Sequence, residues 1–212
     1  MSSRSLLRSG VCVGGFLLFC CVSAAHAADA AATVIEQGGR GATAFFSALD
    51  STGCISSAVF VIADDNSEQT RPDAPVRTAQ VAVVVSQFDL CVGILLLTGN
   101  GVTTDAAILV APNLESASVN AVVPVLNLAN GTLVDVSVDV TFYGTSPIQA
   151  DAREELDVTI PGYRINTTFR QTFRQASALG DIATVGGDLV SGPSLDAMIQ
   201  NVRVGTVVVR RE

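Results

Sequence analysis

Hydrophobic and polar residues alternate with a period of two through residues 119–143, on both sides of Asn130-Gly131. Successive side chains of a strand point to opposite faces, so the alternation indicates strands with one dry face and one wet face. Asn-Gly favours the positive φ angles of a type I′ turn. The stretch therefore predicts a β-hairpin that turns at Asn130-Gly131.

Similar short apolar runs recur along the chain between turn signals. We expect further strands over residues 42–49, 54–63, 77–88, 91–97, 106–110, 156–160, 182–190 and 198–209. The polar residues 64–76 and 144–157 predict loops, with a single helical turn as an alternative at 151–156, and Gly99-Asn100-Gly101 predicts a turn. About ten strands and no convincing helix indicate an all-β protein, an antiparallel β-sandwich.

Two features leave alternatives open. Residues 164–178 contain the repeat TFRQ-TFRQ, whose period of four fits a helix or a strand, and the threonines favour a strand. Residues 109–115 (LVAPNLE) resemble residues 189–196 (LVSGPSLD). A single domain over 42–212 could thus contain two similar halves, 42–127 and 128–210, or the likeness is chance.

The N-terminal 27 residues have the features of a signal peptide. Arg4 and Arg8 precede an apolar run at residues 11–22, and Ala25-His26-Ala27 matches a signal-peptidase site. The run is too short to span a bilayer comfortably, although an anchoring or buried helix is an alternative. We expect export to the periplasm or the cell exterior, a flexible leader at residues 28–41, and no membrane span after cleavage.

Composition excludes several classes of function. Loss of Arg4 and Arg8 changes the formal net charge from −8 to −10, which disfavours binding of nucleic acid. The only histidine, His26, leaves with the signal peptide, and the chain has no lysine. Histidine-dependent triads, histidine metal sites and lysine Schiff bases are therefore excluded from the mature chain, and we do not expect an enzyme. The lack of lysine suggests a GC-rich bacterial genome.

Two cysteines, Cys54 and Cys91, follow the signal peptide. An even number of cysteines in an exported chain predicts a disulfide. It would close a loop of about 38 residues and contribute roughly 4 kcal/mol in the chain-entropy model. Two buried free thiols are the alternative.

Carboxylates are the remaining candidates for chemistry. Asp64, Asp65 and Glu68 offer oxygen ligands that suit Ca²⁺, but Asp-Asp-Asn is also typical of a solvated turn. A second cluster contains Glu154, Glu155 and Asp157. These residues could serve a glycosidase, which needs two facing carboxyl groups, or could pair with nearby arginines.

Arg170 and Arg174 share a face in either reading of the TFRQ repeat. A basic stripe on an acidic protein could bind a carboxylate or an acidic glycan. Cross-strand pairing with Asp135 and Asp139 on the wet face of the hairpin is the alternative.

These observations predict an exported, non-enzymatic protein with a binding or structural role at or outside the cell surface. Its partner would be an extracellular protein or glycan that the sequence does not identify. The alternative is a carboxylate- or calcium-dependent enzyme that acts on an extracellular polymer. Self-association through an uncovered edge at residues 207–209 is a third hypothesis.

Overall fold

The computed structural model describes residues 32–210, so the predicted signal peptide lies outside the described residues. These residues form eleven β-strands and no helix: β1 (Thr33–Leu49), β2 (Ile55–Thr70), β3 (Val76–Asp89), β4 (Ile94–Thr103), β5 (Ala106–Val110), β6 (Ser116–Asn127), β7 (Thr132–Gly144), β8 (Gln149–Ile160), β9 (Tyr163–Thr184), β10 (Gly187–Pro193) and β11 (Asp196–Arg210). Within this part of the chain no helix has the length and apolarity of a membrane span. The predicted all-β antiparallel architecture is confirmed.

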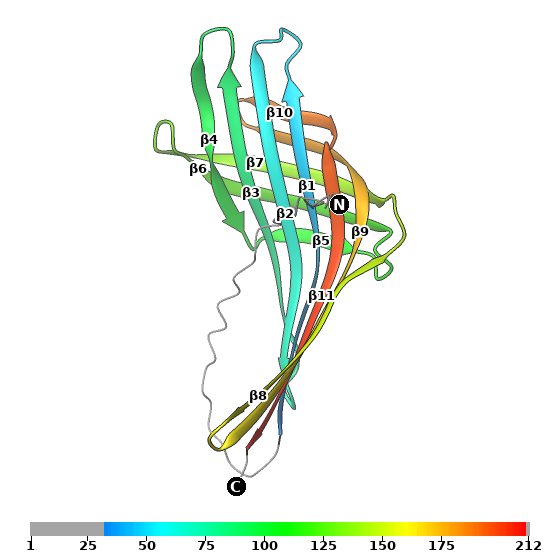
Figure 1. Ribbon diagram of the computed structural model, residues 1–212. Helices are drawn as coiled ribbons and strands as arrows, with labels where there is room; N and C mark the ends of the chain where they lie inside the picture. The colour runs from blue at the N-terminus through cyan, green and yellow to red at the C-terminus, as the bar shows by residue number, and fades with distance from the viewer. Residues whose placement is uncertain (1–31, 211–212) are drawn as a thin grey trace, which may run out of the picture. The chain divides into compact units, whose positions relative to one another are not determined.

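Eight of the strands close into a ring of hydrogen-bonded neighbours (Figure 1). Its order is β9-β11-β1-β2-β3-β4-β6-β7, and β7 pairs with β9 to complete it. The other three strands each add to one ring strand, because β5 pairs with β6 and both β8 and β10 pair with β9. All of these pairings are antiparallel.

One hydrophobic core fills the ring. Alternate residues of most strands point into this core, as in the series Val119, Ala121, Val123 and Val125 of β6, where no other buried residue lies between them. Phe46 of β1 reaches the opposite wall, because a Cβ atom added to Gly180 of β9 would lie 2.8 Å from its ring. The alternation that predicted one dry and one wet face thus places the side chains of the dry face in the core.

The contact between β4 and β6 depends on two glycines. Only three residue pairs join these strands, and Gly99 and Gly101 belong to two of them. An added Cβ would lie 2.0 Å from the Leu126 carbonyl oxygen at Gly99, and 2.1 Å from the Pro124 carbonyl oxygen at Gly101. The predicted turn at Gly99-Asn100-Gly101 is therefore wrong: these residues lie within β4, where the missing side chains let β6 approach.

The predicted hairpin is confirmed as β6 and β7, but its turn differs from the expected type. Asn127 pairs with Thr132, so four residues form the loop, and only Gly131 among them has a positive φ, at 74°. The buried Asn127 side chain fixes the start of this loop. Its Oδ1 atom accepts the Ala129 amide at 3.0 Å, and its Nδ2 atom donates to the Leu96 carbonyl at 3.2 Å.

Several polar segments that predict loops are strands. β1 begins at Thr33, so most of the expected leader at residues 28–41 pairs with β2 and β11. Residues 64–70 continue β2, and β8 replaces much of the loop and the helical turn expected at 144–157. The TFRQ repeat lies in β9, which confirms the strand interpretation. Pairing with neighbouring strands satisfies the backbone hydrogen bonds of these segments, although few of their side chains are apolar enough for a core.

These polar strand segments form a part of the sheet that we call the arm, which comprises residues 33–40, 64–80, 149–174 and 200–210. No side chain described in it is buried, whereas the rest of the described chain, here called the body, contains the whole core. The arm is therefore a single layer with two uncovered faces. In Figure 1 its strands β8, β9, β11 and β1 run on past the ring.

The similar peptides of the two proposed halves have different pairings. The first lies at the end of β5, which pairs with the following strand β6. The second lies in β10, which pairs with the preceding strand β9. The internal repeat stays a hypothesis.

Candidate functional site

The polar face of the arm continues the inward-facing side of the body. Residues paired directly across an antiparallel sheet point to the same face, so the register assigns each side chain to a face. On β8, β9 and β11 the opposite face is largely apolar and includes Leu156, Val158, Ile165, Phe169 and Val204. The polar face carries most of the charged side chains of the arm.

Three arginines lie side by side on the polar face, and we call them the arginine row. Arg170 of β9 pairs with Arg153 of β8 on one side and with Arg203 of β11 on the other. Adjacent strands are about 4.8 Å apart, so the row spans roughly 10 Å at its backbone. All three side chains are exposed, and no ion pair among the described residues involves them.

On β1 and β2, small uncharged residues continue the register line on which the arginine row lies. Beyond Arg203 the same register line passes through Gly38 and Ser67 to Arg77. Like charges that face each other directly across strands destabilise a sheet. Because no ion pair among the described residues engages the row, its guanidinium groups are available to an anionic group.

Arg174 has a different role from Arg170, although the two share a face. Its guanidinium donates to the carbonyls of Ser146 and Asn113 and lies 3.9 Å from Glu115. Its side chain is only 19% exposed, and Gly144 leaves the space it occupies. Arg174 thus ties two loops of the body to β9.

The predicted pairing of these arginines with Asp135 and Asp139 is not formed. β7 pairs with residues 176–184 of β9, so Asp139 lies opposite Asp181 and away from Arg170. The arginines and the aspartates belong to different parts of the sheet, because the arm begins where the β7 pairing ends.

Asp64, Asp65 and Glu68, the predicted calcium ligands, are spread over both faces of β2. Asp65 points to the polar face opposite Arg40, whereas Asp64 and Glu68 point to the other face, four residues apart. The described residues contain no group of three acidic, histidine or cysteine side chains able to hold a metal ion. Asp64 packs over Gly41, and burial raises the pKa of its carboxyl group.

The acidic residues of β8 bond to their strand neighbours. Glu155 accepts a hydrogen bond from Asn166 at 3.1 Å, and Asp157 forms an ion pair with Arg164, as one of the sequence alternatives predicts. The hydrogen bond from Arg164 to Asp157, followed by their Coulomb attraction, raises the pKa of the arginine. Glu154 points to the opposite face, toward Phe169.

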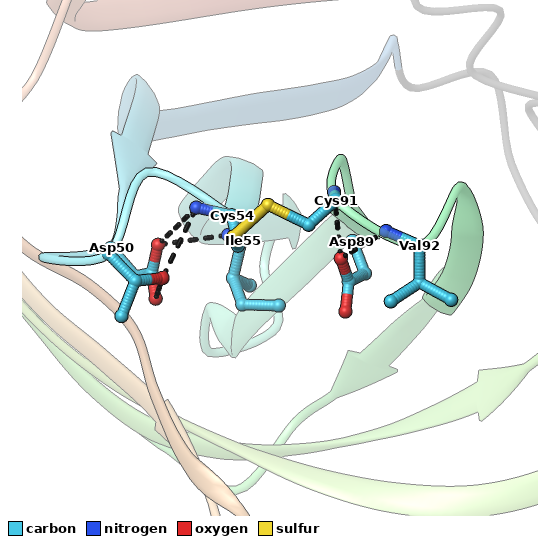
Figure 2. Close-up of a disulfide and its surroundings, with 7 residues drawn as sticks. Asp50, Cys54, Ile55, Asp89, Cys91 and Val92 are labelled. Atoms are coloured by element: carbon cyan, nitrogen blue, oxygen red, sulfur yellow. Dashed lines mark hydrogen bonds between the residues drawn. A yellow bond between two sulfur atoms is a disulfide. The ribbon is translucent and has the colours of Figure 1, made fainter.

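The predicted disulfide between Cys54 and Cys91 is present and joins the β1–β2 turn to the β3–β4 turn (Figure 2). In the first turn, Asp50 Oδ1 accepts the amides of Cys54 and Ile55, each at 2.9 Å. A hydrogen bond from Thr52 is the main cause that lowers the Asp50 pKa. In the second turn, Asp89 accepts the amides of Cys91 and Val92. In each turn, an aspartate carboxylate therefore holds the backbone beside one cysteine of the disulfide.

The body has an acidic hollow on its outer surface. Asp139 and Asp181 lie directly opposite each other on β7 and β9, and Asp188 of β10 lies beside them. Together with neighbours that include Asn120 and Ser137, they line a concavity of about 370 Å³. All three carboxylates are exposed, and Asp181 accepts a hydrogen bond from Ser191 at 2.6 Å. This second unbalanced charge has the opposite sign to the arginine row.

Positive charge is confined to one part of the described chain, the arm, whereas both the arm and the body carry acidic residues. All its arginines lie in the arm: Arg40, Arg71, Arg77, Arg153, Arg164, Arg170, Arg174, Arg203 and Arg210. The charged residues of the body are all acidic: Asp50, Asp89, Asp105, Glu115, Asp135, Asp139, Asp181, Asp188 and Asp196. Sequence reasoning missed Arg153 and Arg203 as partners of Arg170, because only the strand register brings the three together.

No protein-family model matches the chain, and no curated protein matches its sequence. Among solved structures, one match is the crystal structure of an AttH-like protein from Nitrosomonas europaea, with 10% sequence identity and a TM-score of 0.29. The match covers 84% of this chain and 52% of that one, so the chain spans about half the length of the matched structure. At this TM-score the likeness carries no argument about fold or function.

Proposed function

We propose that the chain is an exported, non-enzymatic protein that binds an acidic partner through the polar face of its arm. The observation that carries the proposal is the arginine row: Arg153, Arg170 and Arg203 stand in register, exposed and without carboxylate partners among the described residues. Guanidinium groups form paired hydrogen bonds with carboxylate, sulfate and phosphate groups.

The fold supports a binding role over catalysis. The arm presents flat, uncovered sheet faces. On its polar face, the β8 carboxylates Glu155 and Asp157 are already bonded, Glu155 to Asn166 and Asp157 to Arg164. We infer that the body is a β-sandwich, with two layers of the ring facing each other across the core. Such a body provides a rigid support for the arm, and its disulfide suits an oxidising compartment outside the cytoplasm.

Chromatography on a sulfated polysaccharide tests the proposal. We expect the purified chain to bind at low salt despite its net negative charge, and Arg170→Gln to elute at a clearly lower salt concentration, because binding falls with each lost ionic contact. Arg210→Gln is the matched control, since it removes the same charge from the end of β11 on the opposite face. Equal elution of all three proteins, or no retention of the wild type, would contradict the proposal.

A further inference from the structure

We propose that the acidic partner is a second copy of this chain, and that the arginine row of one copy docks in the acidic hollow of the next. This inference rests on the proposed function, because it names the partner of the same arm. Its first support is charge complementarity: three exposed guanidiniums on one surface match three exposed carboxylates, Asp139, Asp181 and Asp188, on the other.

The two surfaces also match in spacing. Arg153, Arg170 and Arg203 lie on adjacent strands in one register line. Asp139 and Asp181 likewise lie on adjacent strands in one register line. Both sets of charges therefore repeat at the distance between neighbouring strands, about 4.8 Å. With the rows aligned, two guanidiniums of one copy can meet Asp139 and Asp181 of the other. The third can reach along the strands toward Asp188, which pairs with Ala183, two residues from Asp181 on β9.

Contact within one copy is excluded by geometry. Arg170 and Asp181 lie on the same strand, β9, eleven residues apart. At about 3.3 Å per residue the separation is roughly 36 Å, far beyond the reach of an arginine side chain. An odd number of residues also places the two side chains on opposite faces of β9. Only another molecule can bring the row and the hollow together.

Each surface carries an electrostatic cost that docking would remove. In both places like charges face each other directly across paired strands, which destabilises the isolated sheet. Docking replaces two sets of repulsions with charge-assisted hydrogen bonds. Polar groups in the hollow, Asn120 and Ser137, can bond to guanidinium nitrogens that the carboxylates leave free.

The contact is head-to-tail, because it joins two different surfaces. Such contacts form open chains unless the rotation between copies closes a ring. The assembly differs from the edge-strand association hypothesised at residues 207–209, where Val207 and Val208 are paired on both sides, with β9 and with β1. We therefore expect oligomers larger than dimers, held mainly by charge.

Sedimentation velocity of the disulfide-linked chain tests the inference across protein concentration at about 0.02 M and about 0.5 M salt. We expect wild-type oligomers that grow with concentration at low salt and dissociate at high salt. Arg170→Glu, with Arg203→Glu as a second arm variant, and Asp139→Arg should each weaken association at least about tenfold. Arg210→Glu and Asp135→Arg are the matched controls, because both reverse a charge outside the two surfaces, and they should assemble as the wild type does.

Mixing the two kinds of variant gives the decisive result. An Arg170→Glu copy keeps its hollow, and an Asp139→Asn copy keeps its row but loses a carboxylate from its hollow. The asparagine carries no positive charge to pair with the introduced glutamate, so an equal mixture should form a 1:1 heterodimer that cannot grow. A wild type that is monomeric throughout, or a mixture that stays monomeric while the wild type assembles, would overturn the inference. If the monomeric wild type still binds the sulfated polysaccharide through Arg170, only the identity of the partner is refuted. If it does not bind, the proposed function fails as well.

Discussion

Replacement of Gly101 by alanine should open the contact between β4 and β6. The new Cβ would lie 2.1 Å from the Pro124 carbonyl oxygen and 3.1 Å from Val123, whereas real Cβ contacts stay above 3.0 Å. The strands would have to move apart by about 0.9 Å. Only three residue pairs join β4 and β6, so their hydrogen bonds cannot absorb this movement elsewhere.

The cost can be estimated from the two effects involved. Overpacking of a well-packed site costs about 1–3 kcal/mol, and each weakened hydrogen bond about 1 kcal/mol. The lower conformational entropy of the unfolded alanine variant offsets only about 0.4–1 kcal/mol of this loss. We expect Gly101→Ala to lower the free energy of unfolding by about 2–4 kcal/mol, which lowers Tm by roughly 4–16 °C in a domain of this size.

Gly205→Ala is the matched control for this experiment. Gly205 also lies within a strand, β11, but an added Cβ there would meet no atom within 4 Å. We expect this variant to unfold at or slightly above the wild-type Tm, because an unstrained alanine suits a strand better than glycine. Thermal and urea unfolding followed by circular dichroism measure both variants. Unfolding free energies within about 0.5 kcal/mol of each other would refute the reasoning.

Three further predictions concern other parts of the fold. Burial raises the pKa of Asp64 in the folded state above its ordinary value of 3.8, so the free energy of unfolding falls as pH rises from 3.8 through the folded pKa. Asp64→Asn should therefore raise Tm at pH 7 but not below pH 3.8. Asp65→Asn, on the opposite face of β2, is the control. An unchanged Tm at pH 7 would contradict this. Arg174→Gln should lower the free energy of unfolding by about 1.5–3 kcal/mol through lost charged hydrogen bonds, measured by urea unfolding, whereas Arg170→Gln should leave it unchanged or slightly raised, because it relieves repulsion within the arginine row. Equal unfolding midpoints would show that Arg174 does not tie the loops to β9. The double variant Cys54→Ser/Cys91→Ser should lose about 4 kcal/mol, as expected for a bridge over 37 residues, and a Tm equal to that of the wild type would argue against the bridge.

Local patterns are sufficient to predict most strands of the body. The alternation in β6 and β7 reflects a core on one face and solvent on the other, and that relation is local to each strand. The disulfide follows from the two cysteines that lie beyond the predicted signal peptide, together with the expected export. The polar residues 64–70 and 149–155 predicted loops because neither of their faces is buried, and a strand without a core lacks the pattern that identifies one.

Features that depend on register or close approach are invisible in the sequence. Arg170 is a candidate from the TFRQ repeat, but its neighbours Arg153 and Arg203 come from strands that are distant in sequence. Gly99 and Gly101 have the composition of a turn, and only the arrival of β6 shows their role. Asp64 and Asp65 are adjacent in sequence, but the strand sends them to opposite faces.

Strand β9 also determines how the protein would carry a mechanical load. It runs without interruption through arm and body, over about 70 Å at 3.3 Å per residue, and pairs with β7, β8, β10 and β11. Hydrogen bonds in antiparallel sheets lie perpendicular to the strands, so tension along β9 shears many of them at once. A pull on the arm would therefore reach the core through one continuous strand, with no hinge in between to yield first.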